Sequence, residues 1–472
     1  MLVLGVFWDT IGRLSVNAAN IIFTIFLARM LTPNDYGLVA IALSVIVVFE
    51  SLIEGGFAAA FIQKGRTTKA DYSTLFLLQL SVASVALILL QAMAGPLAEF
   101  LGYGEIESIL RILSLSVFIM ALFNTIKVRL MRAVRFQTVA AVEAVSSLLA
   151  GVVAIVMAQC GFEYWSLVVQ YMLVKAISLM LFWYCAPLKL TGCSFESFKS
   201  ISHYGLFSSL SSLVRAITNQ LDSLVLVKLF GPDFLGVYSR AKALRDLAVN
   251  YSGGALGRVF FSVSSRAGVE RNNSFYFKTV EIVALLSALI SGLFFVSTSE
   301  LIEILLGSQW LAAVLVLKFL LVADGISKPV GAVMVSTLAG LGKANLEFYG
   351  VLVKRAAWLV CLYLLWLYGL NVFLWTLIAH SVFVYIVDAL LLFYAAGYRV
   401  SRQIISPFKA LLVFGLSCGV VELCHVESVG IALNLVVNSL VFLLSFSVLS
   451  LVLFSNLSNT ILRSLAGLSD GR

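Results

Sequence analysis

Polar side chains recur at helical spacing within two segments that are otherwise apolar. The first set follows intervals of four, four, three and four positions and consists of Asp9, Arg13, Asn17, Asn20 and Thr24. The second set consists of Ser208, Ser212, Arg215, Asn219 and Asp222. Because such intervals place each set on one face of a helix, both segments are predicted to be helices with a polar stripe.

An arginine inside an apolar helix needs water or an anion beside it, so the two stripes predict a water-filled cavity that binds a substrate. Other basic residues in apolar segments extend this cavity. The predicted binding residues are Arg13, Asn17, Asn20, Lys175, Arg215, Asn219, Asp222, Lys242 and Arg245. The alternative is that the asparagine and serine side chains bond neighbouring helices, and that Asp9 and Arg13 neutralise each other.

Three carboxylates are candidates for binding a coupling ion. Glu50 and Glu54 lie one helical turn apart in an apolar segment, where a desolvated carboxylate pair can carry H⁺ or Na⁺. An equally open alternative is that they pair with a cation. Asp324 precedes Lys328 by four positions, and Pro329 follows Lys328 directly. This pattern predicts a broken helix lining a cavity. Lys354 is expected to reach the cytoplasmic surface.

No catalytic motif accompanies these residues. The chain lacks a Walker sequence, an HExxH or GxSxG sequence and a DxD-type metal site, and its six cysteines are scattered. We therefore expect no enzymatic activity, no catalytic residues, no metal site and no cofactor other than a coupling ion.

The composition indicates that the polar stripes lie on membrane-spanning helices. Apolar residues make up 61% of the chain and charged residues 12%, about half of what a soluble domain carries. Apolar runs recur that can cross about 30 Å of hydrocarbon as helices. We predict an all-α polytopic membrane protein with about 14 transmembrane helices, at 7–31, 37–62, 73–95, 107–127, 138–160, 164–186, 204–230, 236–262, 277–299, 310–340, 346–368, 371–396, 406–424 and 429–454.

The charged residues of the loops indicate an orientation. Every second loop carries Lys and Arg, for example Arg129, Arg132 and Arg135, whereas the intervening loops carry mainly Glu. Short loops rich in Lys and Arg stay in the cytoplasm, so both termini are predicted to be cytoplasmic. The net charge of +8 is spread over these loops without a basic tail, which disfavours nucleic acid as a partner.

A short break in the apolar pattern occurs twice, as LTPNDYG at 31–37 and LFGPDFLG at 229–236. Pro33 then aligns with Pro232, and Gly37 with Gly236. The offset corresponds to six spans, which predicts a parallel duplication with a pseudo-twofold axis along the membrane normal. The predicted parts are an N-terminal lobe of six helices at 1–190, a C-terminal lobe of six helices at 204–397 and an appended helix pair at 406–456. The alternative is the ordinary use of Pro and Gly at turns.

Six stretches follow one another in a characteristic order over about the first 270 residues. They are LARMLTPNDYGLVAIAL at 27–43, FESLIEGGFAAAFIQ at 49–63, LRILSLS at 110–116, RLMRAVRFQTVA at 129–140, GFEYWSLVVQ at 161–170 and NQLDSLVLVKLFGPDFLGVYSRAKAL at 219–244. With these stretches the chain resembles the Wzx-type polysaccharide flippases, in the polysaccharide-transporter branch of the MOP superfamily, and within it the colanic-acid-exporter-like subgroup. It departs from the family in having no basic residue before Arg13.

The resemblance implies a flippase of the bacterial inner membrane. Such a protein moves undecaprenyl-diphosphate-linked oligosaccharide from the cytoplasmic to the periplasmic leaflet by alternating access, for lipopolysaccharide or exopolysaccharide synthesis. Its partners would be this lipid-linked oligosaccharide, the phospholipid bilayer and the polysaccharide polymerase. Arg13, Arg215, Lys242 and Arg245 would contact the phosphates, and the asparagines the sugar.

Two other functions stay open. A cation-coupled exporter of drugs in the same superfamily fits the fold, but a cavity rich in Arg and Lys disfavours cationic substrates. A membrane oligosaccharide polymerase or ligase needs a large external loop with catalytic residues, whereas the outward loops here are short.

Overall fold

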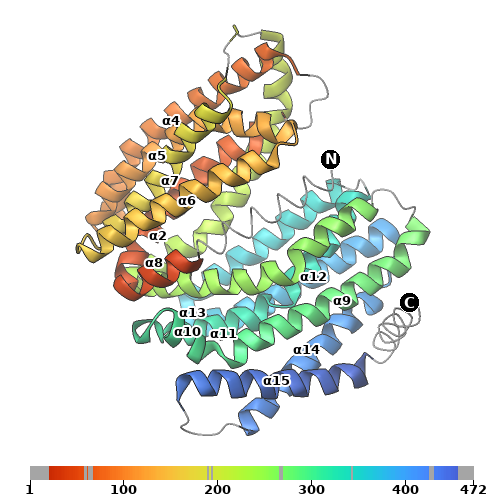
Figure 1. The fold of residues 1–472 in the computed structure, drawn as a ribbon. Helices are drawn as coiled ribbons and strands as arrows, with labels where there is room; N and C mark the ends of the chain where they lie inside the picture. The colour runs from red at the N-terminus through yellow and green to blue at the C-terminus, as the bar shows by residue number, and fades with distance from the viewer. Residues whose placement is uncertain are drawn as a thin grey trace, which may run out of the picture. The chain divides into compact units, whose positions relative to one another are not determined.

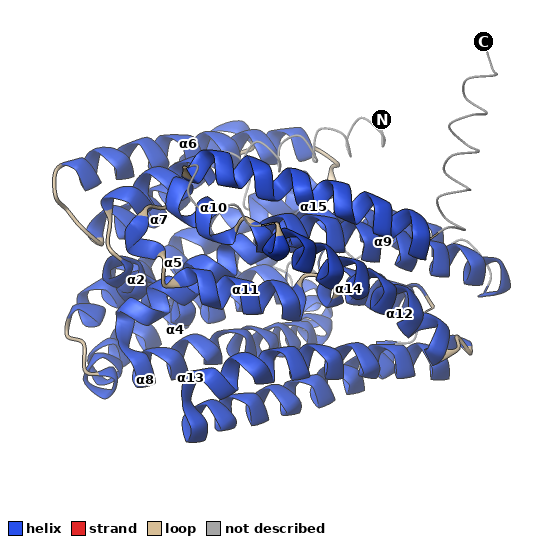
Figure 2. Ribbon diagram, turned by 90° about the horizontal axis from the view of Figure 1, so that it is seen from below, coloured by secondary structure: helices blue, strands red, loops and turns tan. Residues whose placement is uncertain are grey.

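The structure, a computed structural model, describes residues 21–57, 61, 67–188, 191–192, 195–264, 269–341, 344–424 and 430–454. These residues are helical almost throughout and include no strand (Figures 1 and 2). Within this described part, nine helices are long and apolar enough to cross a membrane. The predicted all-α polytopic membrane fold is therefore confirmed.

Contacts between residues divide the chain into two compact units, Met1–Ser239 and Arg240–Arg472. In the first unit the described helices are Ile21–Met30, α2 (Pro33–Ser51), the π-helix Leu52–Phe57, α4 (Lys69–Leu101), α5 (Glu105–Arg132), α6 (Phe136–Gln159) and α7 (Trp165–Cys185). Helix α8 (Phe195–Ser264) begins in the first unit and ends in the second. The lobe limits and the pseudo-twofold axis proposed from the repeat stay predictions.

Helix α5 is the centre of the first unit, because it contacts α2, α4, α6 and α7. Its first turn contains Glu105 and Glu107, and its last turn contains Arg129 and Arg132. These charges oppose the helix dipole at both ends and so stabilise the helix. Apolar side chains from the second half of α5 form one core cluster with side chains of α4, α6 and α7, and these helices run side by side in Figure 1.

The two repeated breaks begin helical segments in the same way, with a proline in the first turn. At the first break, Thr32 caps α2, Pro33 follows it, and the Asp35 carboxylate accepts a hydrogen bond of 2.8 Å from the backbone N–H of Thr32. At the second break, Gly231 interrupts α8 with φ +82° and ψ 175°, and Pro232 resumes the helix. Gly231 thus adopts a backbone conformation that other residues rarely reach, and Pro232 occupies a position where its missing N–H costs nothing.

The two breaks also meet each other, which the sequence did not predict. A Cβ atom on Gly37 would lie 1.9 Å from the backbone oxygen of Pro232, and a Cβ atom on Gly236 would lie 1.9 Å from the backbone oxygen of Pro33. Each glycine therefore allows the backbone of the other break to approach closely, as small residues do where membrane helices cross. The repeated Pro and Gly form one reciprocal crossing of α2 and α8.

The second unit continues α8 with helices that are packed mainly around α9. Its described elements are α9 (Val269–Val296), α10 (Thr298–Leu305), the 3₁₀-helix Ser308–Trp310, α11 (Ala313–Asp324), α12 (Ser327–Gly340), α13 (Ala344–Ala396), α14 (Val400–Leu423) and α15 (Ile431–Leu453). The interruption between α11 and α12 is the broken helix expected at Asp324. Helix α13 contains two predicted spans and is interrupted at Gly369, with φ +77°.

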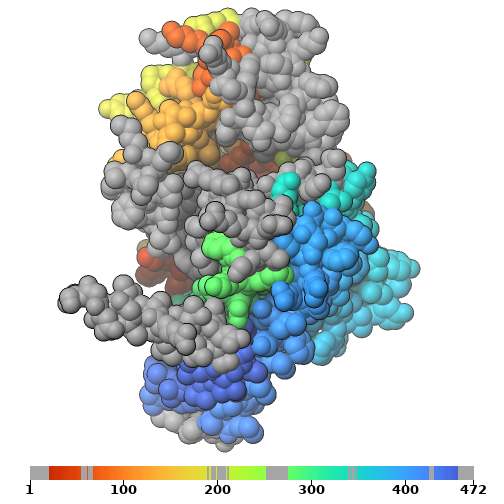
Figure 3. Space-filling view, turned by 90° about the vertical axis from the view of Figure 1, so that its right-hand side faces the viewer, coloured from red at the N-terminus to blue at the C-terminus, as the bar shows by residue number. Residues whose placement is uncertain are grey.

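Buried polar contacts fix the helices of the second unit. The amide nitrogen of Gln403 on α14 donates to the backbone oxygens of Ala389 (3.1 Å) and Tyr398 (3.0 Å), and its amide oxygen accepts from the hydroxyl of Tyr276 on α9 (3.0 Å). The appended pair packs against α9: α14 and α15 both contact it, and the three helices adjoin in the space-filling view (Figure 3). The amide of Asn438 on α15 donates to Glu300 on α10 at 3.1 Å.

The crossing of the two breaks predicts a cost for any side chain at its glycines. Gly37→Ala or Gly236→Ala should lower the free energy of unfolding by about 1–3 kcal/mol, because the added methyl group overpacks a backbone contact. The thermal unfolding midpoint of the purified protein in detergent measures this. The control is Gly415→Ala on α14, where an added Cβ meets nothing within 4 Å, so that alanine's better helix propensity dominates. Equal midpoints for Gly37→Ala and Gly415→Ala would contradict the close crossing.

Candidate functional site

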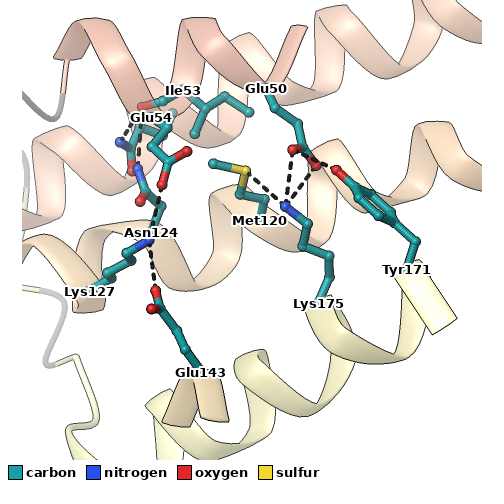
Figure 4. Close-up of polar contacts among 10 residues, drawn as sticks. Glu50, Ile53, Glu54, Met120, Asn124, Lys127, Glu143, Tyr171 and Lys175 are labelled. Atoms are coloured by element: carbon teal, nitrogen blue, oxygen red, sulfur yellow. Dashed lines mark hydrogen bonds and ion pairs between the residues drawn. The ribbon is translucent and has the colours of Figure 1, made fainter. Parts of the chain in front are cut away.

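A buried carboxylate on α2 accepts hydrogen bonds from two other helices. Glu50 lies 3.0 Å from the ammonium nitrogen of Lys175 on α7. The hydroxyl of Tyr171, one turn earlier on α7, donates to the same carboxylate at 2.8 Å, and the hydroxyl of Ser116 on α5 donates at 3.3 Å. Figure 4 shows Tyr171 and Lys175 converging on Glu50. The Glu50 carboxylate is thus neutralised and hydrogen-bonded within the protein, as a buried charge requires.

A second ion cluster lies one turn further along the same chain segment. The ammonium nitrogen of Lys127 on α5 lies 3.0 Å from Glu54 and 3.0 Å from Glu143 on α6 (Figure 4). Glu54 and Glu143 are partly exposed, with 55% and 39% of their side chains accessible. Lys127 therefore bridges two carboxylates, of which only Glu54 was a predicted coupling residue.

A widened helical turn begins after Glu50 and contains Glu54. The π-helix Leu52–Phe57 contains Ile53, whose backbone oxygen accepts hydrogen bonds from the amides of Gln79 on α4 (3.2 Å) and Asn124 on α5 (3.3 Å). The hydroxyl of Thr125 donates to Gln79 at 2.8 Å and orients it. Side chains that bond to a helix carbonyl hold such an irregular turn in place, and π-turns are frequent at functional sites. The direction of Glu54 relative to Glu50 is fixed by these contacts.

The second unit contains a comparable ion cluster. Arg245 on α8 is buried and pairs with Asp324 at the end of α11, and it also contacts Asp246 at 2.9 Å. Lys328 on α12 lies 2.8 Å from Asp324, and the hydroxyl of Ser381 donates to the same carboxylate at 3.2 Å. Asp324 is thereby held between two cations at the interruption of the helix.

The expectation for Lys354 is wrong. Its ammonium nitrogen lies 2.7 Å from the buried carboxylate of Asp388, so it pairs within α13 rather than reaching the surface. The two halves of α13 fold back on each other at Gly369, which brings these two residues together. The spans predicted at 346–368 and 371–396 imply this reversal, but the sequence does not show which side chains the reversal brings together.

The polar stripe of α8 contains both exposed and buried residues. Arg215 and Asn219 are exposed, and the described residues provide no hydrogen-bond or ion-pair partner for either side chain. Asp222 is buried and accepts a hydrogen bond of 3.1 Å from the hydroxyl of Tyr238, beyond the interruption of α8. Lys242 is half-buried and makes contacts of its own within the protein. Arg13, Asn17 and Asn20 lie outside the described residues.

The structure brings predicted residues together in pairs. Glu50 and Asp324 were predicted to bind a coupling ion, and Lys175 and Arg245 to bind a substrate. Glu50 pairs with Lys175, and Asp324 with Arg245. Both assignments stay predictions. Because each of these two carboxylates pairs with a predicted substrate-binding cation, binding of the ion and binding of the substrate would affect each other. Within the described residues no group of His, Cys, Asp and Glu has the arrangement of a metal site.

Several residues of these clusters escaped the sequence analysis. They are Ser116, Tyr171, Lys127, Gln79 and Asn124. Tyr171 lies four positions before Lys175, so the spacing that identified the stripes also indicates this residue. Lys127 is the last residue of the span predicted at 107–127, beside the basic loop residues, which hid its contacts within the membrane. Gln79 on α4, and Ser116 and Asn124 on α5, are polar residues within apolar spans, and this position also indicates that they make contacts inside the protein.

Comparisons with known proteins agree with this architecture. A family model described as polysaccharide biosynthesis protein matches residues 26–315. The succinoglycan biosynthesis transport protein ExoT of Rhizobium meliloti (strain 1021) is 25% identical over 356 residues, which cover 74% of this chain and 71% of that protein. The teichuronic acid biosynthesis protein TuaB of Bacillus subtilis (strain 168) is 24% identical over 470 residues, which cover 93% and 94%.

Among solved structures, the inward closed conformation of the lipid II flippase MurJ matches with a TM-score of 0.74. The match covers 95% of this chain and 99% of that chain, at 13% sequence identity. A likeness at this identity shows the fold alone.

The bridging position of Lys127 predicts its effect on stability. Lys127→Met should lower the free energy of unfolding by about 1–3 kcal/mol, because Glu54 and Glu143 lose their counter-ion. The triple variant Lys127→Met, Glu54→Gln, Glu143→Gln should recover most of this loss, since no unpaired charge remains. Thermal unfolding of the purified variants measures both effects. A triple variant less stable than Lys127→Met would contradict the role assigned to the bridge.

Proposed function

Because this chain belongs to the polysaccharide biosynthesis protein family, we propose that it is a flippase for a lipid-linked oligosaccharide. Its membership confirms the resemblance found in the sequence. In the proposed reaction, an oligosaccharide on undecaprenyl diphosphate moves from the cytoplasmic to the periplasmic leaflet of a bacterial inner membrane. Its partners are this substrate, the bilayer and a polysaccharide polymerase, and both chain termini lie in the cytoplasm.

The observation that carries the proposal is the open pair on α8. Arg215 and Asn219 lie one turn apart and are exposed. By contrast, Lys127, Lys175 and Arg245 are paired with carboxylates. An arginine within a membrane helix is costly unless water or an anion contacts it. A guanidinium group can donate two hydrogen bonds to a phosphate, and an amide can bond a sugar hydroxyl.

The same observation bears on the alternative of a cation-coupled drug exporter. A cationic drug would be repelled by Arg215, and most carboxylates described in the ion clusters are already paired with Lys or Arg. The exposed side chains of Arg215 and Asn219 on α8 are better suited to binding an anion than a cation.

The proposed mechanism is alternating access. A charged headgroup is excluded from hydrocarbon, so a polar cavity that opens to one leaflet and then to the other lowers the barrier, while the lipid tail stays in the bilayer. Glu50, Glu54 and Asp324 are the proposed sites at which H⁺ or Na⁺ exchanges during this cycle. The chain itself would make and break no covalent bond.

Removing the open cation tests the function. In cells that depend on this protein, Arg215→Ala should lower export of surface polysaccharide by about tenfold or more, which corresponds to one lost charge-assisted hydrogen bond. Arg215→Lys should retain part of the activity, because the charge remains but the two-pronged geometry is lost. Surface polysaccharide and the accumulated lipid-linked intermediate are measured at equal protein levels.

The matched control is Val214→Ala, a truncation of the exposed neighbouring residue, which should leave export unchanged. Normal polymer in the Arg215→Ala strain would contradict the assignment of Arg215 to the substrate.

A further inference from the structure

Three hydrogen-bond donors around Glu50 have the composition of an oxyanion site. They are the ammonium group of Lys175, the phenol of Tyr171 and the hydroxyl of Ser116, at 3.0, 2.8 and 3.3 Å from the carboxylate. Figure 4 shows the first two of these donors. Two helices, α5 and α7, supply them, whereas the carboxylate comes from α2. Lysine and hydroxyl groups bind phosphate oxygens by the same charge-assisted bonds. The carboxylate thus occupies a position that suits a phosphate oxygen.

We infer that Lys175, Tyr171 and Ser116 form a binding site for the diphosphate group of the substrate, and that Glu50 fills this site until a proton neutralises it. The choice of ligand rests on the proposed function. Glu50 then acts as an internal competitor: while ionised it holds Lys175, and once protonated it releases Lys175 to the incoming anion.

The charge balance of the surrounding residues supports this exchange. The charged groups that face one another here are Glu50 and Glu54 from the α2 segment, Lys127 from α5, Glu143 from α6 and Lys175 from α7, with Tyr171 as a further titratable group. Three carboxylates thus face two ammonium groups. A diphosphate would meet a net negative charge, so neutralising one carboxylate favours its binding.

Glu50 is the carboxylate whose neutralisation matters most. In the described part of the chain Lys175 has one ion-pair partner, Glu50, whereas Lys127 has two. Neutralising Glu54 or Glu143 therefore leaves Lys127 paired, but neutralising Glu50 leaves Lys175 without a counter-ion. An unpaired charge in a buried place is costly, and the Lys175 side chain is only 17% exposed. A bound phosphate relieves that cost.

The experiment measures binding to the purified full-length protein in lipid nanodiscs. The probes are farnesyl diphosphate and inorganic pyrophosphate, titrated by calorimetry at pH 6 and pH 8. Glu50→Gln should bind farnesyl diphosphate at least about tenfold more tightly than wild type at pH 8, which is about 1.4 kcal/mol.

Two variants separate a local site from a general charge effect. The gain of Glu50→Gln should disappear in Glu50→Gln, Lys175→Gln. Glu143→Gln removes the same charge from the same network without releasing Lys175, so its gain in affinity for farnesyl diphosphate at pH 8 should be much smaller than that of Glu50→Gln. The inference is overturned if Glu50→Gln binds no more tightly than Glu143→Gln, or if its gain survives Lys175→Gln. Pyrophosphate that shows the same pattern supports a site for the diphosphate group itself.

Two further measurements keep the test decisive. If Glu50→Gln does not fold, Tyr171→Phe takes its place, since it retains the ion pair but lacks one donor. It should bind farnesyl diphosphate more weakly than wild type at pH 6, and equal binding would overturn the inference. Export of surface polysaccharide is followed separately. Binding that behaves as expected in a protein without export activity would refute the proposed function and leave the site intact.

Discussion

The hydrocarbon core of a membrane provides no water for polar groups, so the protein itself must bond them. Helix ends show how this chain does so. Arg129 on α5 donates to the carbonyls of Ala186 and Pro187, directly after α7, at 2.9 and 3.2 Å, and Lys409 on α14 donates to the last carbonyl of α15 at 3.2 Å. Lys228 on α8 likewise donates to a carbonyl at the end of α4. Cations at helix C-termini also oppose the helix dipole. These basic residues therefore join neighbouring helices.

The same constraint explains the ion clusters and distinguishes Arg215. Glu50, Glu54 and Asp324 are each bonded by at least one cation from another helix. A cation in a membrane span with described partners has a structural explanation. Arg215, in the span predicted at 204–230, is exposed and its side chain has no such partner among the described residues, so under the proposed function water or a ligand solvates it. It differs in this from Lys127, Lys175 and Arg245, which are paired with carboxylates.

The sequence could reveal those features that depend on neighbouring positions. Apolar length predicted the nine helices of the described part that can cross a membrane, whereas the spans predicted at 204–230, 236–262 and 310–340 are not among them. Proline and glycine marked the interruptions at Gly231 and at Asp324, because a local pattern decides each of them. Contacts between distant segments could not be predicted in this way. The repeat at Pro33 and Pro232 was visible, but their mutual crossing was not. The stripe on α8 was visible too, yet only the packing shows that Asp222 turns to Tyr238 while Arg215 stays open.

Pairing a binding cation with a coupling carboxylate has a thermodynamic consequence under the proposed function. If substrate takes Lys175 from Glu50, then neutralising Glu50 favours substrate, and bound substrate must favour neutral Glu50 to the same extent. The cluster at Asp324 responds differently, because Arg245 and Lys328 both contact this carboxylate. Neutralising Asp324 would leave Arg245 and Lys328 close together at the interruption between α11 and α12, with Asp246 as the remaining partner of Arg245, which costs more than releasing a single lysine. Exchange of an ion for the substrate is therefore easier at Glu50 than at Asp324.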